Sequence, residues 1–176
     1  MRIGIDISQL AFANTGVANY LLHLVDRLVE NEDNEYVLFY SSMRRKVPAE
    51  VIKLTHNCNV TLKTVKIPPI VLNVLWNKLH KISVEKFTGP IDIFITSDWT
   101  EPPTKKAKKA TILYDVIIYK YPQETAKKII SVQKKKLEWV KKETDVIFCI
   151  SEATKKDAIE LGFNEKKMKV IYPGTM

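Results

Sequence analysis

Hydrophobic and polar positions along this chain predict strands and helices that follow one another in turn. Alternating positions and short apolar runs, rich in β-branched and aromatic residues, predict strands over residues 2–7, 35–40, 59–67, 91–96, 111–115, 144–150 and 169–172. Apolar residues at helical spacing predict helices over residues 16–29, 70–87, 122–142 and 152–161. Ser151 fits the N-cap of the last helix, and Gly162 fits a left-handed C-cap.

This order of elements predicts an α/β fold, a Rossmann-like three-layer sandwich with a mostly parallel sheet and right-handed crossovers. A length of 176 residues and a hydrophobic content of 45% fit one compact domain. The chain reaches a predicted strand and a Pro173-Gly174 turn at its end. From that ending we expect the sequence to be one domain of a longer protein.

The charge balance favours anionic partners, because 28 Lys+Arg stand against 20 Asp+Glu for a formal net charge of +8. Lysine clusters on a predicted helix usually form a solvated face, and contact with an acidic membrane surface is the alternative. No RNA-binding or helix-turn-helix motif is present, so we expect no nucleic-acid partner. Without a secretory signal core or a span-length apolar run, the expected location is cytoplasmic, with a peripheral membrane contact left open.

Cysteine and histidine positions give no sign of a metal site. Cys58 and Cys149 lack the spacing of a ligand or redox pair, and Cys149 falls in an apolar run where a buried thiol packs well. His23, His56 and His80 have no second ligand at metal spacing. We therefore expect no bound metal.

Candidate chemistry is sought in the loops that follow the strands, where open parallel sheets bind their ligands. In the first loop, Gly16 opens the predicted helix after Thr15, so that backbone N–H groups can face an anion such as a pyrophosphate. A lone glycine is not the G-x-G-x-x-G pattern, which disfavours a standard dinucleotide site. A tight turn with no ligand is the alternative for Gly16.

Two further loops carry carboxylates. Asp98 and Trp99 follow the strand over 91–96, where an aromatic ring beside polar groups suits stacking on a sugar or base. The alternative is that Trp99 closes the sheet edge while Asp98 caps a turn. Asp115 stands at the carboxyl end of a predicted buried strand, where an aspartate is costly unless it is hydrogen-bonded or functional.

Four segments in order resemble the N-terminal half of a family 4 glycosyltransferase with the GT-B architecture. They are Met1–Ile7 with Thr15–Leu22, Leu113–Ile117 with Tyr121–Gln123, Ile150–Asp157, and Val170–Gly174. Asp115 matches the aspartate of the family's His-Asp segment, whereas Tyr114 stands where many relatives carry histidine. The role of that histidine therefore does not carry over to this chain.

The resemblance implies a retaining transfer of a sugar from a nucleotide-sugar co-substrate to an acceptor glycan, lipid or small molecule. It implies no obligatory metal or other cofactor, and a reaction cleft between two Rossmann-like halves. Residues 1–176 would form the N-terminal, acceptor-side domain. The C-terminal donor-binding domain of the same polypeptide would lie outside this sequence, so this chain alone would be inactive.

The resemblance also implies roles for individual residues. Gly16, with Thr15 and Val17, would lie near the donor diphosphate. Asp115 would be the catalytic residue near the transferred sugar or the acceptor hydroxyl. The acceptor side would be shaped by Asp98, Trp99 and Asn19.

Three alternatives come from other functional classes. The first is a stand-alone binding module or pseudoenzyme with the same fold. The second is another nucleotide-binding enzyme, such as an epimerase or reductase, which the lone Gly16 disfavours. The third is a peripheral membrane adaptor, which would bind vesicles in a salt-sensitive way without affinity for nucleotide sugars.

Overall fold

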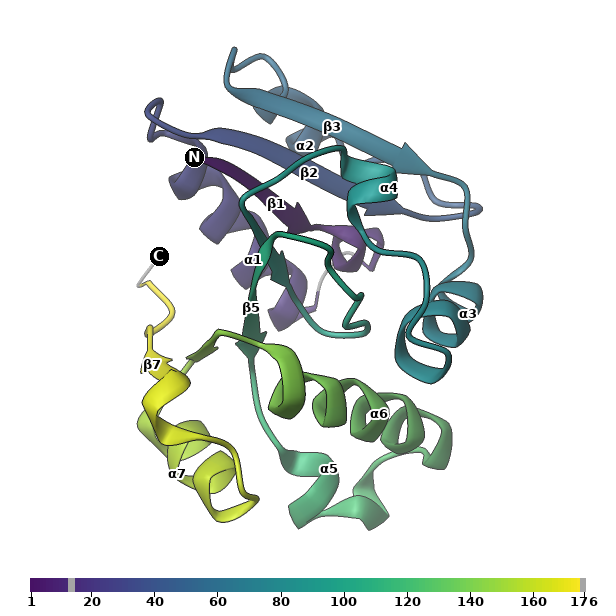
Figure 1. Cartoon of the computed structure of the whole chain (residues 1–176), viewed down its shortest axis with the longest axis vertical. Helices are drawn as coiled ribbons and strands as arrows, with labels where there is room; N and C mark the ends of the chain where they lie inside the picture. The colour runs from purple at the N-terminus through teal and green to yellow at the C-terminus, as the bar shows by residue number, and fades with distance from the viewer. Residues whose placement is uncertain (13–14, 175–176) are drawn as a thin grey trace.

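The computed structural model describes residues 1–12 and 15–174, which form one sheet with helices on both faces (Figure 1). The sheet has 7 strands in the order β3-β2-β1-β4-β5-β6-β7, and every pairing in it is parallel. The strands are β1 (Arg2–Asp6), β2 (Glu35–Ser41), β3 (Val60–Val65), β4 (Ile93–Thr96), β5 (Lys108–Leu113), β6 (Val146–Cys149) and β7 (Met168–Val170). The predicted α/β, Rossmann-like class is confirmed, with a sheet that is parallel throughout the described residues. Ala13 and Asn14 of the predicted glycine loop, and the C-terminal Thr175 and Met176, lie outside the described residues.

The crossovers between strands contain helices of very different length. The α-helices are α1 (Gly16–Val29), α2 (Ala49–Leu54), α3 (Pro69–Leu72), α4 (Glu85–Thr88), α5 (Ile117–Lys120), α6 (Lys127–Glu143) and α7 (Glu152–Glu160). Short 3-10 turns are η1 (Ser8–Ala11), η3 (Pro122–Glu124) and η4 (Glu165–Lys167), and η2 (Asn73–Lys78) is a π-helix. The sequence patterns did not predict α2.

Helix ends follow the predicted caps. The Thr15 hydroxyl accepts a hydrogen bond from the Ala18 amide at 3.2 Å, so α1 begins at Gly16 as expected. The Ser151 hydroxyl accepts from the Thr154 amide at 3.1 Å and starts α7. Gly162 ends that helix with a φ of 84°, the left-handed conformation that favours glycine.

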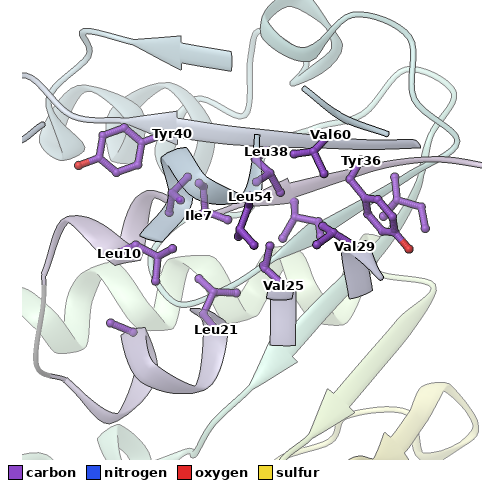
Figure 2. Close-up of a cluster of buried hydrophobic side chains, with 14 of the residues drawn as sticks. Ile7, Leu10, Leu21, Val25, Val29, Tyr36, Leu38, Tyr40, Leu54 and Val60 are labelled. Carbon is purple, nitrogen blue, oxygen red and sulfur yellow. The ribbon is translucent and has the colours of Figure 1, made fainter. Parts of the chain in front are cut away.

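Strand β2 shows how the period of two divides the core between the two faces of the sheet. Leu38 points toward α1 and α2, where it meets Leu21 and Val25 in the cluster drawn in Figure 2. Val37 and Phe39 point to the opposite face, into a cluster that contains Trp76 of η2. Both faces of this strand are therefore buried, which explains its continuous apolar run.

The helix predicted over residues 70–87 is wrong in its extent. The helical segment ends at Lys78, and the chain then turns through His80 and Ile82, which have φ values of 49° and 65°. The indole Nε1 of Trp76 donates to the Ile82 carbonyl at 2.9 Å, so this turn folds back over the buried tryptophan. A local apolar period continues through the turn, but the buried Trp76, which packs on Phe39 of β2 and holds the Ile82 carbonyl, decides the backbone.

A third cluster fills the half of the molecule around β5, β6 and β7. Leu137 and Val140 of α6 pack there against Ile147 and Cys149 of β6. Cys149 is a free, buried thiol, as predicted, and burial raises its pKa to about 11. No helix between residues 1–12 and 15–174 combines the length and apolar character that crossing a membrane needs.

Candidate functional site

The order of strands reverses between β1 and β4, which is where open parallel sheets form a binding crevice. Asp6 ends β1, Ser97 follows β4, and both line a cavity of about 700 Å³ at the carboxyl edge of the sheet. Its other walls come from η1, the segment after β2, α3 and the first turns of α6. Residues of α3 and of the first turn of α6 thus face one cavity, although they are far apart in sequence.

Asp6 brings a buried carboxyl group to the floor of this cavity. Its Oδ1 accepts a hydrogen bond from the Ser8 amide at 2.9 Å. Burial raises the pKa of Asp6, and the bonds from Ser8, the positive charge of Lys136 and the hydroxyl of Thr100 oppose that rise.

Lys136 places a buried ammonium group behind the same crevice. Its side chain is 2% exposed, and its Nζ donates to the Ser97 carbonyl and, at 3.1 Å, to the Thr111 hydroxyl. Burial lowers the pKa of Lys136, while the charges of Glu101, Asp98 and Asp6 raise it. The ammonium therefore ties α6 to the loop that follows β4.

A buried ion pair supports the same loop from the side of the sheet. Glu101 lies 3.3 Å from the Nζ of Lys109 and accepts 2.7 Å and 3.2 Å hydrogen bonds from the hydroxyls of Thr96 and Thr144. Its backbone amide donates to the side chain of Asn77 at 3.0 Å. All these partners hold residues 97–101 against the sheet, which gives Asp98 and Trp99 a fixed frame.

Asp98 and Trp99 lie between two cavities, because both residues line the large one and also a smaller one of about 180 Å³. Asp98 accepts a hydrogen bond from the Gln133 side chain at 2.8 Å. Burial raises its pKa, which Lys136 and Gln133 lower and Asp115 raises. The indole Nε1 of Trp99 is buried without a hydrogen-bond partner among the described residues.

Tyr114 and Asp115 follow β5 on the side of the smaller cavity. Burial raises the pKa of Tyr114, whose hydroxyl lies 3.0 Å from that of Ser97 and whose ring meets Tyr20 edge-on at 5.6 Å. Tyr114 is thus a neutral phenol at ordinary pH. Asp115 is exposed, and its Oδ1 accepts from the Ile117 amide at 2.9 Å, so its carboxylate needs no buried counter-charge.

The first turn of α1 is open to solvent. Thr15 and Gly16 are exposed, and a Cβ built on Gly16 would meet nothing within 4 Å. Val17 lines the smaller cavity, whereas Thr15, Gly16 and Asn19 line neither cavity. The structure thus brings Val17, Asp98, Trp99 and Asp115 together around one small space and leaves the other predicted residues at its margin.

The sequence patterns missed the charged and polar groups behind the loops. The prediction of a solvated lysine face on the helix over 122–142 is wrong for Lys136, which is 2% exposed; Lys109, outside the predicted helices, is also buried, at 3%. Helical spacing could have identified Lys136 as an inward-facing residue, because it lies on the same face of α6 as Gln133 and Val140. Gln9 lines the large cavity, and its Oε1 has no partner within residues 1–12 and 15–174; no sequence pattern indicated this. The described residues hold no cluster of three or more His, Cys, Asp or Glu side chains suited to a metal ion.

Comparison with known protein families decides what kind of fold carries this site. The family model described as Glycosyltransferase Family 4 matches residues 14–175. The chain belongs to this family. A search of curated protein sequences finds no significant match to this family 4 chain.

Solved structures show that the family 4 chain has the fold of half a GT-B glycosyltransferase. A crystal structure of Anabaena Alr3699/HepE in complex with UDP and glucose matches with a TM-score of 0.55 and 15% identity, over 99% of this chain and 45% of that chain. The complex of HepE with UDP-glucose matches with a TM-score of 0.55 and 16% identity, over 99% of this chain and 44% of that one. The chain therefore spans less than half the length of the structures it resembles, and at this identity the likeness concerns the fold alone.

Proposed function

We propose that this chain is the N-terminal, acceptor-side half of a retaining glycosyltransferase. The enzyme would transfer a sugar, most simply a hexose, from a nucleotide sugar to an acceptor in a cleft that a C-terminal donor-binding domain completes. The observation that carries the proposal is the cavity at the carboxyl edge of the sheet, lined by Gln9 and Trp99, whose Oε1 and Nε1 have no hydrogen-bond partner among the described residues. Sugar hydroxyl groups both donate and accept, so they would satisfy the Gln9 oxygen and the Trp99 N–H together.

The proposed roles of individual residues are those that the resemblance to family 4 implies. The amides of Gly16, with Thr15 and Val17, would approach the donor diphosphate, which the exposed backbone at Gly16 permits. Asp115 would act near the transferred sugar or the acceptor hydroxyl, and Asp98, Trp99 and Asn19 would shape the acceptor side. The likeness to HepE, which was solved with UDP and with glucose, supports a nucleotide sugar as co-substrate.

The proposal extends to the whole enzyme. Charge develops on the leaving diphosphate during transfer, and fixed donors and cations must stabilise it. Because this half of the fold covers only one side of the cleft, this chain alone would be inactive. The enzyme would work in carbohydrate biosynthesis in the cytoplasm, without a metal or other cofactor, and would touch an acidic membrane only at its surface.

The test is a transfer assay with the full-length protein and a panel of nucleotide sugars. Release of the nucleoside diphosphate and formation of a glycosylated product are expected with one donor. The anomeric configuration of that product, read by NMR, should equal that of the donor. An inverted product would refute retention, and a failure to bind any nucleotide sugar would refute the proposed function.

Gly16→Val provides the sharpest test of the first loop. The added side chain has open space around its Cβ, so the domain should stay folded, while the isopropyl group should keep the donor diphosphate from the amides. Transfer by the full-length enzyme is expected to be lost, with an unchanged circular dichroism spectrum and melting temperature. Asp26→Val, at an exposed position further along α1, is the matched control and should keep full activity. Full activity in Gly16→Val would refute the role of this loop.

A further inference from the structure

The large cavity is apolar over most of its wall. Phe12, Ile70, Leu72, Ile129 and Val132 line it from the segment after η1, from α3 and from α6. A cavity of about 700 Å³ with this lining has the size and character of a site for a small organic ligand. A purely polar acceptor would leave these apolar walls without a partner.

The apolar surface continues outside the cavity. Ile70, at the cavity wall, is 57% exposed, and Val71 and Val74 on the same helical segment are 41% and 37% exposed. Contiguous exposed apolar side chains on a soluble domain mark a place where another apolar group binds. A chain that enters the cavity could therefore leave it past Ile70 and remain in contact with apolar side chains.

Positive charge lines the same cavity from two sides. Arg44, after β2, and Lys128, in the first turn of α6, are exposed and form no ion pair within residues 1–12 and 15–174. The neighbouring Arg45 is already engaged, since its guanidinium donates to the Ala11 carbonyl at 2.7 Å and lies 4.8 Å above the ring of Phe12. Arg44 and Lys128 are thus the cations that remain for an anionic group of the ligand.

The floor of the cavity is polar. Asp6 and Gln9 are 7% and 6% exposed, and the Oε1 of Gln9 has no partner among the described residues. A buried amide oxygen without a partner requires a donor such as a hydroxyl group. The same cavity therefore has a polar floor for hydroxyl groups, two cations at its wall and an apolar surface at its opening.

We infer that this cavity takes an acceptor in which a sugar is joined through a phosphate group to an aliphatic chain. The inference rests on the proposed function, whose acceptor class it names. The sugar lies on the floor near Gln9, the phosphate lies between Arg44 and Lys128, and the chain leaves along α3 past Ile70. An anionic, lipid-linked saccharide has this order of groups.

Binding of alkyl phosphates to the full-length protein tests the inference, with every probe kept below its micelle concentration. Decyl phosphate should bind roughly tenfold more tightly than octyl phosphate, because two additional methylene groups are buried at about 0.8 kcal/mol each. Decyl maltoside, which has no charge, should bind more weakly than decyl phosphate. Inorganic phosphate alone should bind far more weakly than either alkyl phosphate.

Matched variants locate the binding. Lys128→Glu and Arg44→Glu should each lower the affinity for decyl phosphate at least about fivefold, because an attractive ion pair is replaced by a repulsive one. Lys127→Glu, one residue earlier on α6 and outside the cavity lining, should have no such effect. Ile70→Asp should weaken binding, whereas Leu79→Asp, equally exposed but away from the cavity, should not.

Different binding results would overturn different parts of the inference. Equal affinity for octyl and decyl phosphate, or inorganic phosphate binding as tightly as both, would overturn the aliphatic part of the inference. Decyl maltoside binding as tightly as decyl phosphate, unaffected by Lys128→Glu, would overturn the phosphate part. Transfer to a water-soluble acceptor that decyl phosphate does not inhibit would overturn the inference and leave the proposed function standing. Alkyl phosphate binding without affinity for any nucleotide sugar would refute the proposed function instead.

Discussion

Lys136 is the residue on which the candidate site depends most. A buried ammonium group is costly unless it is paired, and here Asp6, Asp98 and Glu101 supply the opposing charge. Its hydrogen bond to the Ser97 carbonyl fixes the start of the loop that carries Asp98 and Trp99. The residue thus links the stability of the fold to the geometry of the acceptor side.

Lys136→Met should cost about 3–5 kcal/mol of the free energy of unfolding, because it leaves buried carboxyl groups without their counter-charge. Urea denaturation at pH 7 measures this loss. Lys135→Met is the control, since Lys135 is exposed and pairs with Glu138 on the surface of the same helix; it should change stability by less than about 0.5 kcal/mol. Equal stability of the two variants would contradict the structural role of Lys136.

Glu85 gives the fold a dependence on acidic pH. Burial alone would raise its pKa, but backbone N–H groups, including those of Lys105, Lys106 and Ala107, lower it below its ordinary value of 4.5. A carboxyl group with a lowered folded-state pKa stabilises the protein above pH 4.5 and loses that effect as the pH falls through the folded-state value.

Glu85→Gln should therefore be less stable than the wild type at neutral pH, and the difference should shrink below pH 4.5. The free energy of unfolding, measured by urea denaturation from neutral to acidic pH, checks this. Glu124→Gln, in the exposed turn η3, gives the background effect of removing one surface carboxylate. If the difference in the free energy of unfolding between wild type and Glu85→Gln grew on acidification, the lowered pKa of Glu85 would be contradicted.

At the scale of elements, the turn after η2 holds two residues in backbone conformations that their own side chains disfavour. Ile82 has a φ of 65°, a conformation that crowds the Cβ of a β-branched side chain. The Ile82 carbonyl accepts the hydrogen bond of the buried Trp76 indole, which holds the turn in place. His80, two residues earlier, also has a positive φ; its ring stacks on Trp139 of α6 at 3.6 Å and lies 2.9 Å from the carboxylate of Glu143.

Ile82→Gly should stabilise the protein by up to about 1 kcal/mol, since relief of about 1–2 kcal/mol of left-handed strain exceeds the entropy cost of glycine. Ile52→Gly is the matched control, because Ile52 is similarly exposed but lies within α2. It should destabilise by about 1 kcal/mol, the ordinary cost of glycine in a helix. The melting temperatures of the two variants should thus move in opposite directions, and a loss in both would contradict the strain at Ile82.

The elements themselves were mostly predictable, and the main exceptions lie in where two helices begin and end. Patterns of period two and 3.6 located β1, α1 and α7, because apolar faces and capping residues lie within each segment. The predicted extents of two helices are wrong: in the segment 70–87, Trp76 packs on Phe39 of the distant strand β2, and in the segment 122–142, residues 122–124 form a separate 3-10 turn before α6. The loops of the candidate site were predictable because they follow the strands. The buried charged residues that hold these loops, such as Lys136 and Glu101, were not predictable.

At the scale of the whole chain, residues 1–176 carry a formal net charge of +8, which favours contact with anionic surfaces. Vesicles that contain an acidic phospholipid should therefore bind the full-length protein, with each lysine near the surface adding about 1 kcal/mol. Raising the salt concentration from about 0.1 M to about 1 M shortens the screening length from about 10 Å to about 3 Å and should release the protein. Sedimentation with vesicles measures this, and neutral vesicles are the control. Binding that persists at high salt would contradict a contact dominated by charge.

The sequence by itself determined the class of fold, the position of the candidate loops and the family, because these depend on local periodicity and on short segments such as Leu113–Ile117. Only the tertiary structure decided which side chains share a space. It placed Lys136 among carboxylates that lie 35 to 130 positions away, an arrangement that no local pattern of charge records. It also gathered Phe12, Ile70 and Lys128 around one cavity, because the carboxyl ends of parallel strands and the starts of their helices meet at one edge of the sheet.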